Sequence, residues 1–273
     1  MGDLETDKVF SGSIATLYEQ YLVPLIFEPY ATDLAKRLQS RRPGSVLEIA
    51  AGTGVATRAM DLALAPGVSI VATDLNPAMI EQARAVGTQR AVEWKQADAM
   101  QLPFGDATFD AVVCQFGAMF VPDKAKAFAE ALRVLKPGGA FLFNVWDRIE
   151  ENEFADVIMA ALAEVFPDDP PRFMARTPHG YHDRSTIARD LAGGGFSKPA
   201  DIATLAARSR AKSAREPAIA YCQGTPWRSE IEARAAARLG EATDAAEQAI
   251  ARRFGKGPVD GKIQAHVITV ERP

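Results

Sequence analysis

The sequence has little of what metal centres and disulfide frameworks require. It contains only two cysteines, Cys114 and Cys222, neither of them in a CxxC pair, and three histidines. We therefore expect neither a disulfide framework nor a metal site. No charge-free stretch exceeds about a dozen residues, whereas a membrane-spanning helix needs ~20. The start, MGDLETDKVF, is acidic and polar, unlike a signal peptide, so we expect a cytoplasmic protein without membrane contact.

An excess of positive charge is also absent. The chain has 31 Lys and Arg against 35 Asp and Glu, a net charge of -4, which argues against a broad surface for nucleic-acid phosphates. A small ligand is the expected partner. With 48% hydrophobic residues in 273, the chain is predicted to form one folded domain over residues 1–273.

Short apolar runs alternate with helical stretches from Ser45 onward, and apolar residues on both parities indicate strands buried on both faces. Asn76 with Pro77, and Asp123, are helix-start signals, and Pro137-Gly138-Gly139 is predicted to end the second of these helices. Alternating βα units predict a doubly wound, mostly parallel α/β sheet of seven strands. The strands are expected at 46–50, 69–74, 92–96, 110–114, 140–146, 201–207 and 262–270.

The segments outside this core are predicted to be largely helical. Residues 10–38 form one or two helices, further helices lie at 152–166 and 183–192, and a helical insertion at 208–261 precedes the last strand. We divide the single domain into residues 1–40, a cofactor-binding core at 41–147, and a C-terminal half at 148–273 with acceptor-site elements.

The most informative segment is a strand that ends in Glu48 and turns through Ala50, Gly52 and Gly54 into a helix. Glycines at such a strand end let the backbone approach a ligand closely. A nicotinamide-binding loop has a third glycine where the helix binds pyrophosphate, and Thr57 occupies that position. The Glu48 carboxylate would repel pyrophosphate but suits a ligand that carries an ammonium and a sulfonium. The pattern favours S-adenosylmethionine.

Two further acids follow the next strands. Asp74 can accept both hydroxyls of a ribose, as in either cofactor class, and Asp98 can accept from an adenine amino group while the Ala99 amide donates to the ring. Each acid alone could be an ordinary turn cap. Their matching places at successive strand ends indicate cofactor contact.

Six motifs, taken together, resemble those of class I S-adenosylmethionine-dependent methyltransferases, in the small-molecule group that includes the ubiquinone and menaquinone biosynthesis methyltransferases. The resemblance covers residues 42–147 strongly, and Ala50 stands where the family has its first glycine. It implies a Rossmann-like methyltransferase fold. The motifs are E-x-A-x-G-x-G (48–54), TDLNPAM (73–79), QADA (96–99), LPF (102–104), FDAVVCQFG (109–117) and LKPGG (135–139).

The resemblance also implies roles for individual residues. The methionine portion of the cofactor would contact Glu48, Ala50, Gly52, Thr53 and Gly54. The ribose would contact Asp74, the adenine faces Leu75 and Met79, and the adenine edge Asp98 and Ala99. Gln115 and Phe116 would lie beside the transferable methyl.

Aromatic residues of the N-terminal helices fall roughly on one helical face: Tyr18, Tyr21, Phe27 and Tyr30. They could pack onto the sheet, or form the lid that this family's N-terminal segment often provides, with a hydroxyl of Tyr18 or Tyr21 at the cofactor carboxylate. We expect an acceptor pocket of mostly apolar side chains. Its candidates are Tyr18, Tyr30, Phe116, Trp146 and Tyr181.

His179 and His182, in the loop TPHGYHD, could be a general base, because histidine titrates near neutral pH, or they could cap the loop. Together with Gln115 they are the candidate catalytic residues. Direct in-line displacement of the methyl, which leaves S-adenosylhomocysteine, requires mainly orientation, which can lower a barrier by ~7 to 11 kcal/mol.

Two alternatives stay open at this point. One is an NAD(P)-dependent oxidoreductase, disfavoured by Thr57 and Glu48, and the other is a non-catalytic module that binds S-adenosylmethionine. The composition of the variable segments does not distinguish an O-, N- or C-methyl acceptor, nor does the sequence indicate an oligomeric state.

Overall fold

The computed structural model describes residues 13–273 of the chain. The seven strands in this part of the chain form one sheet, and all seven predicted strands are confirmed, although β5 begins at Leu135 instead of residue 140 and β6 ends at Ala211 instead of residue 207. They are β1 (Ser45–Glu48), β2 (Ser69–Asp74), β3 (Glu93–Gln96), β4 (Phe109–Gln115), β5 (Leu135–Trp146), β6 (Asp201–Ala211) and β7 (Val259–Glu271).

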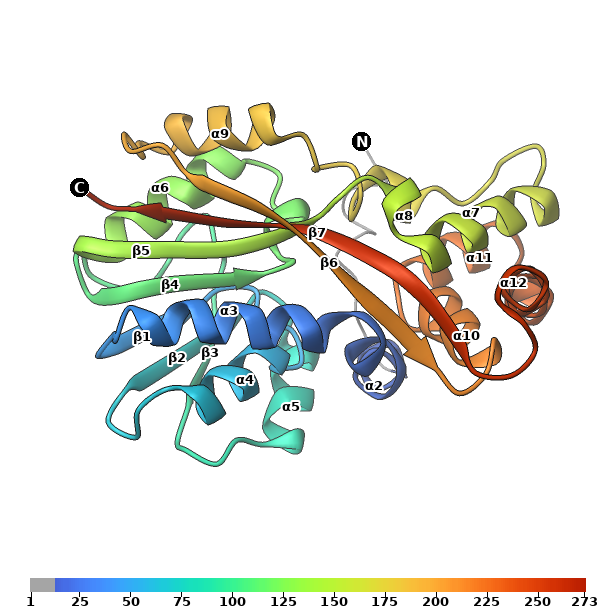
Figure 1. Cartoon of the computed structure of the whole chain (residues 1–273), viewed down its shortest axis with the longest axis horizontal. Coiled ribbons are helices and arrows are strands. Elements are labelled where there is room, and N and C mark those ends of the chain that lie inside the picture. The colour runs from blue at the N-terminus through green and yellow to red at the C-terminus, as the bar shows by residue number, and fades with distance from the viewer. Residues whose placement is uncertain (1–12) are drawn as a thin grey trace. The chain divides into compact units, whose positions relative to one another are not determined.

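The strand order is β3-β2-β1-β4-β5-β7-β6 (Figure 1). The first five strands pair in parallel, and β7 runs antiparallel to β5. The predicted doubly wound, mostly parallel sheet is therefore confirmed. The order reverses between β1 and β4, and ligands of such sheets bind at this switch point, outside the carboxyl ends of the strands.

The chain divides into two compact units. The sheet unit consists of Glu28–Trp146, Tyr181–Leu205 and Ala265–Pro273. The helical unit consists of Met1–Phe27, described from residue 13, with Asp147–Gly180 and Ala206–Gln264.

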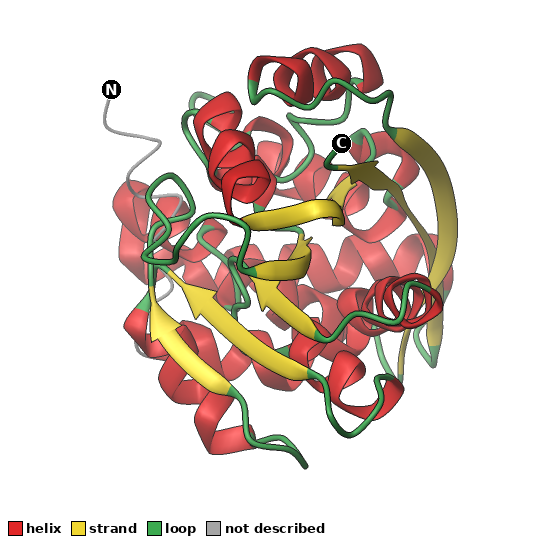
Figure 2. Cartoon of the chain, turned by 90° about the vertical axis from the view of Figure 1, so that its left-hand side faces the viewer, coloured by secondary structure: helices red, strands yellow, loops and turns green. Residues whose placement is uncertain are grey.

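Helices of the sheet unit cover both faces of its strands (Figure 2). On one face, Leu34 of the first helix and Met60 of the second join a buried core with Leu142 of β5. On the other, Phe128 packs on Phe141 and Phe143 of β5, with ring centroids 5.6 and 5.3 Å apart. The helices are α3 (Glu28–Ser40), α4 (Val55–Ala63), α5 (Pro77–Val86), η2 (Ala118–Phe120), α6 (Lys124–Val134) and α9 (Arg184–Gly193).

Local sequence explains where these helices begin. The Asn76 side chain accepts a hydrogen bond from the Ala78 N–H, with Pro77 at the first helical position, and Asp123 accepts from the Lys126 N–H. The predicted end of α6 at Pro137-Gly138-Gly139 is wrong, because the helix already ends at Val134. Leu135 is extended and pairs with Phe109, and a register shift before Ala140 accommodates the turn inside β5.

The helical unit contains the confirmed insertion before the last strand. The predicted N-terminal helical region is observed from residue 13, while residues 10–12 lie outside the described part. It includes a ten-residue π-helix with Pro24 inside. The helices are α2 (Ser13–Leu17), η1 (Tyr18–Phe27), η3 (Ile149–Glu151), α7 (Glu153–Val165), α8 (Phe173–Arg176), α10 (Arg215–Gln223), α11 (Trp227–Ala235), η4 (Ala236–Arg238) and α12 (Leu239–Phe254).

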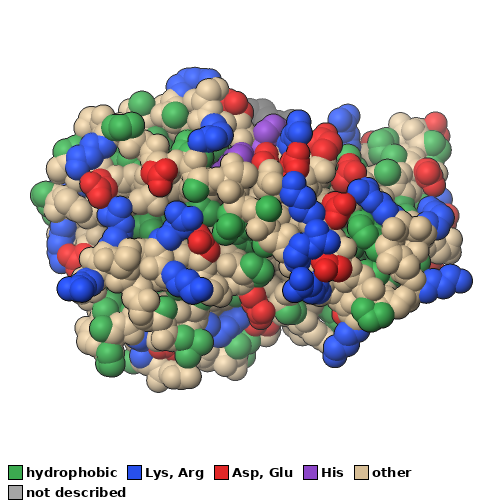
Figure 3. All heavy atoms as spheres, in the orientation of Figure 1, with side chains coloured by type: hydrophobic (Ala, Val, Ile, Leu, Met, Phe, Trp, Pro, Cys, Tyr) green, Lys and Arg blue, Asp and Glu red, His purple; other side chains and the backbone are tan. Residues whose placement is uncertain are grey.

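Charged side chains of both signs are interspersed on the face seen in Figure 3. Within the helical unit, Arg208 and Arg210 both pair with Asp260, at 2.7 and 3.2 Å. In the described part of the chain, no helix is both long and apolar enough to cross a membrane.

Candidate functional site

Buried polar residues gather where the parallel strands of the sheet unit end. Glu48 ends β1 and pairs in register with Val113, two residues before Gln115, which ends β4. Gln115 in turn pairs with Asn144 of β5. Because side chains alternate along a strand, these three lie on the same face as Leu142 and the α3 core. The sheet therefore places a carboxyl and two amides side by side at its switch point.

The loop after β1 is a tight turn with left-handed residues. Ala50, Gly52 and Gly54 have φ angles of 53°, 56° and 85°. A Cβ on Gly54 would lie 2.8 Å from the Trp94 ring, so this glycine is required by close packing as well as by its φ angle. A Cβ on Gly52 would meet nothing within 4 Å, which leaves open space at that point of the loop.

The substitution of Ala50 for the usual glycine is accommodated by the neighbouring loop. A Cβ on Gly117, just after β4, would lie 2.4 Å from the Ala50 Cβ, so the alanine methyl occupies the space that a side chain at position 117 would need. The loops after β1 and β4 are therefore packed tightly together at this point.

Glu48 is a buried carboxyl group, and one of its two oxygens has no hydrogen-bond partner. The Thr57 hydroxyl donates to its Oε2 at 2.5 Å, whereas its Oε1 and the nearby loop hydroxyl, Oγ1 of Thr53, are buried without a hydrogen-bond partner. Burial raises the pKa of Glu48 from 4.5 to about 8, opposed by the Thr57 hydrogen bond and the Arg58 charge. A cationic ligand group would compensate this buried acid, and the site fits a ligand that carries an ammonium and a sulfonium.

Asp74 joins the end of β2 to the glycine loop. Its Oδ2 accepts from the Gly52 N–H at 2.7 Å, and its Oδ1 accepts from the Asn76 N–H at 2.8 Å. Burial raises its pKa, and these N–H groups oppose the shift. Each carboxylate oxygen has a second lone pair, so Asp74 can hold the loop and still accept a hydroxyl.

The predicted adenine-binding residues differ in exposure. Leu75 is 50% exposed, whereas Met79 is buried in α5. Asp98 accepts from the Met100 N–H at 2.8 Å and so closes its own turn, with Ala99 half-buried beside it.

Three aromatic rings pack together at the ends of β4 and β5. Phe116 stacks on Trp146 with centroids 3.9 Å apart and planes 8° apart, and Tyr30 of α3 meets both rings edge-on at 5.3 Å. All three are buried, and the Tyr30 hydroxyl donates to the Leu205 carbonyl at 3.2 Å. Tyr30 therefore has a structural partner already.

The loop residues belong to different units. His179, in the helical unit, is buried with Nδ1 2.8 Å from the Asp147 carbonyl oxygen. His182, half-buried, and Tyr181 belong to the sheet unit. The Tyr181 hydroxyl donates to Asp190 at 2.8 Å, and the Lys124 ammonium lies 4.7 Å from its ring centroid.

The N-terminal tyrosines lie in the helical unit. Tyr18 stacks on Phe27 within η1, with centroids 5.2 Å apart, and Tyr21 is half-buried. The packing within η1 is thus observed, and the lid stays a prediction.

Sequence reasoning missed two polar residues of the site. Thr57 was noted only as the residue at the third glycine position, yet its hydroxyl binds Glu48. Asn144 lies in the apolar run of β5 and is fully buried, with its side-chain oxygen 3.1 Å from the Phe116 N–H. A lone amide in a buried strand was the signal that could have found it.

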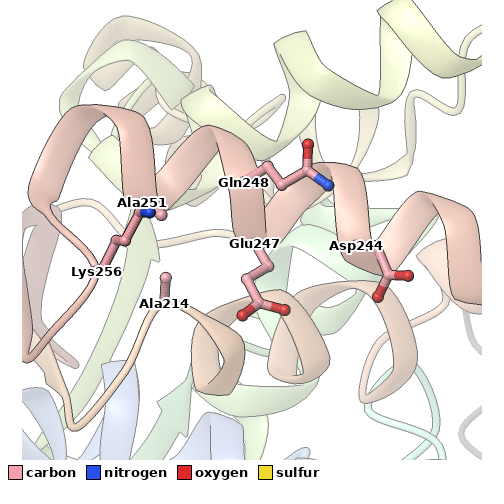
Figure 4. A pocket seen from close by; sticks show the side chains of 6 residues that line it. All are labelled: Ala214, Asp244, Glu247, Gln248, Ala251 and Lys256. Carbon is pink, nitrogen blue, oxygen red and sulfur yellow. The ribbon is translucent and has the colours of Figure 1, made fainter.

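A separate hollow of about 380 Å³ lies in the helical unit, against α12 (Figure 4). Asp244 and Glu247 point to the same side of α12, and Arg215 pairs with both. These charges are already compensated, and we assign the hollow no part in the site. No cluster of three metal-ligating side chains is found within residues 13–273. The hollow is lined by Ala214, Asp244, Glu247, Gln248, Ala251 and Lys256.

Comparison with known proteins decides the family. The methyltransferase domain family matches residues 47–143. The ubiquinone/menaquinone biosynthesis C-methyltransferase of Ectopseudomonas mendocina is 30% identical over 210 residues, which cover 72% of this chain and 77% of that protein. The enzyme of the same name from Idiomarina loihiensis is 31% identical over 58% of this chain and 68% of its own. The chain belongs to the class I S-adenosylmethionine-dependent methyltransferases.

Solved structures show the same fold for this methyltransferase. An S-adenosylmethionine-dependent methyltransferase of Thermotoga maritima superposes with a TM-score of 0.56 at 16% identity, over 97% of this chain and 98% of the other. The phosphoethanolamine N-methyltransferase 2 of Haemonchus contortus gives a TM-score of 0.61 at 17% identity, over 98% of this chain and 59% of the other. At these identities the likeness concerns the fold.

Family membership decides between the sequence alternatives. The protein is an enzyme that transfers a methyl group to a small-molecule acceptor, and neither the oxidoreductase nor the non-catalytic alternative is supported. Thr57 fits this result, because it donates to an acid instead of leaving space for pyrophosphate.

Proposed function

We propose that the sheet unit of this methyltransferase binds S-adenosylmethionine over the loop after β1. The observation that supports this most is the buried Glu48, whose Oε1 and the neighbouring Thr53 Oγ1 have no hydrogen-bond partner. These atoms would hold the ammonium end of the cofactor, and the open space at Gly52 would admit its methionine portion. Ala50 and Gly54 shape the loop for it.

The same proposal gives the adjoining strand ends their roles. Asp74 would accept the ribose hydroxyls through its remaining lone pairs, Leu75 and Met79 would contact the adenine faces, and Asp98 with Ala99 would contact its edge. Gln115 and Phe116 would lie beside the methyl group. Tyr21 and Tyr18 would contribute if residues 1–40 act as a lid.

When bound, the cofactor supplies a methyl group that its sulfonium makes electrophilic. The protein then has to orient the acceptor and keep water out, and the stacked rings of Phe116 and Trp146 would do this at the strand ends. Tyr181 remains a candidate for acceptor contact, while Tyr30 packs edge-on against the rings of Phe116 and Trp146. No covalent enzyme intermediate is required.

We further propose that the acceptor is an electron-rich hydroquinone-type ring that is methylated on carbon. This rests on the relatives, whose names describe ubiquinone/menaquinone C-methylation. In such a step the sulfur–methyl bond would break, a carbon–carbon bond would form, and the ring carbon would lose its proton to a base. The remaining products are S-adenosylhomocysteine and the methylated hydroquinone.

His179 and His182 are the candidate bases. The carbonyl of Asp147 only accepts hydrogen bonds, so the neutral His179 ring carries its proton on Nδ1. If His179 is the base, His179→Gln lowers the rate and removes the acid limb of the pH–rate profile, whereas His182→Gln leaves both unchanged. An unchanged profile in both variants would remove histidine from the mechanism.

The first experiment measures melting of the purified protein with S-adenosylhomocysteine, S-adenosylmethionine and NADH. A ligand at a hundredfold excess over its Kd stabilises the folded state by about 2.7 kcal/mol. We expect a shift with the two sulfur compounds and none with NADH. Glu48→Gln and Asp74→Asn should weaken the shift, and a shift with NADH alone would overturn the proposal.

The second experiment follows labelled methyl into three acceptors of matched size: a hydroquinone without a ring methyl, a phenol blocked on its ring carbons, and an amine. Label on a ring carbon supports C-methylation. Label on oxygen or nitrogen alone contradicts it while leaving the methyltransferase assignment intact.

The domain division and the cytoplasmic location also stay predictions. We propose that the whole of 1–273 serves this one reaction and that residues 1–40 form its lid. Deleting residues 1–30 should then weaken S-adenosylhomocysteine binding and slow turnover. Unchanged affinity and rate would remove the lid.

A further inference from the structure

Asn144 carries a buried amide side chain that makes one hydrogen bond in the structure, to the Phe116 N–H. Its side chain is 0% exposed, on the α3 face of β5 between Leu142 and Trp146. Its Oδ1 accepts from the Phe116 N–H at 3.1 Å, and its main-chain oxygen accepts from the same N–H at 3.2 Å. One N–H is therefore held by two oxygens of one residue.

Phe116, which donates to Asn144, has an unfavourable backbone conformation. Phe116 has a φ angle of 52°, in the left-handed region that a bulky residue rarely adopts. This turn directs the chain from β4 into η2 and lays the Phe116 ring flat on Trp146. Such a conformation persists where surrounding contacts over-determine it, and these cluster at functional sites.

Burial of the Asn144 amide costs stability, because part of the side chain has no hydrogen-bond partner. The Nδ2 of Asn144 is buried without a hydrogen-bond partner, and most neighbours in β5 are apolar. An apolar side chain of similar volume would avoid that cost, but it would leave the Phe116 N–H with the main-chain oxygen of residue 144 as its one acceptor from this residue. The strand therefore retains an amide where stability alone favours a leucine.

We propose that Asn144 is a positioning residue for methyl transfer, which acts by holding the Phe116 peptide in its left-handed turn. The inference rests on the proposed function, in which Gln115 and Phe116 lie beside the methyl group. When the turn is fixed, the Phe116 ring stays stacked on Trp146 and forms a rigid side of the acceptor pocket. Asn144 itself need not touch the cofactor or the acceptor.

The test replaces Asn144 with leucine, which keeps the volume and removes the side-chain acceptor, so that only the main-chain oxygen of residue 144 still accepts from the Phe116 N–H. We expect kcat to fall roughly tenfold or more, because small displacements at a reacting centre are costly. The Kd for S-adenosylhomocysteine should stay within about threefold, because the loop after β1 is untouched. Leu142→Val, on the same face of β5, is the matched control and should change neither quantity. Asn144→Ala replaces the leucine variant if that variant does not fold.

Two readouts separate positioning from loss of stability. With 5-fluorotryptophan in the three tryptophans, the fluorine resonance of Trp146 reports the Phe116 ring stacked on it. This resonance should move in Asn144→Leu, well below the melting temperature, and stay in place in Leu142→Val. It is assigned by its loss in Trp146→Phe.

The second readout is a double-mutant cycle with Phe116→Gly. Glycine adopts the turn without help and lacks the ring, so adding Asn144→Leu should lower kcat little further. Independent, multiplying losses would overturn the proposal, as would an unmoved Trp146 resonance in Asn144→Leu. If the wild type binds no S-adenosylhomocysteine, the proposed function fails, whereas the resonance still tests whether Asn144 holds Phe116.

Discussion

Replacing Glu48 by glutamine tests whether the protonation state of this one carboxyl group controls the affinity for the cofactor. Burial raises the pKa of Glu48 to about 8, so at pH 6 to 7 the carboxyl is mostly protonated in the protein alone. A ligand ammonium requires the carboxylate form. If only that form binds, the Kd for S-adenosylhomocysteine should fall roughly fiftyfold between pH 6 and pH 8, in proportion to the ionised fraction.

Calorimetric titration at half-unit steps of pH measures this directly. Repeating it in buffers of different ionisation enthalpy counts the protons released, and close to one should leave per ligand bound near pH 6.5. Glu48→Gln binds more weakly and loses the slope, while any titration of the ligand affects both proteins equally. Asp74→Asn is the matched control, which should bind more weakly but keep the slope. Equal pH dependence in wild type and Glu48→Gln would refute the reasoning.

The same carboxyl predicts how stability changes with pH in the protein without ligand. The folded-state pKa of about 8 lies above the unfolded value of 4.5, so the folded state binds the extra proton between these pH values. The stabilisation from this group is complete below pH 4.5 and is lost as the pH rises to 8, at about 1.4 kcal/mol per pH unit and on the order of 5 kcal/mol in all. Urea unfolding at pH 5 to 8 should therefore show Glu48→Gln gaining on wild type as the pH rises. The exposed Glu93→Gln serves as control, and a pH-independent gap between Glu48→Gln and wild type would contradict the prediction.

Three substitutions test the packing of the loop after β1 and a buried ion pair elsewhere in the sheet unit. Gly54→Ala places a Cβ 2.8 Å from the Trp94 ring at a φ of 85° and should cost about 3 kcal/mol in urea unfolding. Gly52→Ala meets no atom within 4 Å and should cost about 1 kcal/mol, yet weaken S-adenosylhomocysteine binding more than any other change in the loop. Equal stability losses in the two variants would show that the Trp94 contact is unimportant. Arg90→Ala should cost about 3 to 5 kcal/mol, because it leaves the buried Asp61 carboxylate, now 2.8 Å from the guanidinium, without its cation. A loss below about 1 kcal/mol would mean that water replaces the arginine.

Sequence alone determined the order of elements and much of the site. Signals that act within about ten residues were sufficient: the Asn76 cap with Pro77, the apolar strand runs, and the glycine loop that follows Glu48. The strand-end positions of Asp74 and Asp98 followed from the same pattern. The bounds of several elements differ from the predicted ones, and α6 ends earlier than predicted because the pairing of Leu135 with Phe109 outweighs the local turn signal.

Only the tertiary structure showed which polar groups form hydrogen bonds with one another. The Thr57 hydroxyl reaches Glu48 because α4 packs back over β1, and Asn144 reaches the Phe116 N–H because β4 and β5 pair in a particular register. The position of β7 between β5 and β6 is likewise a matter of pairing between distant segments. Caps and periodicity depend on neighbouring residues. Thr57 and Glu48 are nine residues apart and Phe116 and Asn144 are 28 apart, and only the folded sheet with its helices brings the members of each pair together.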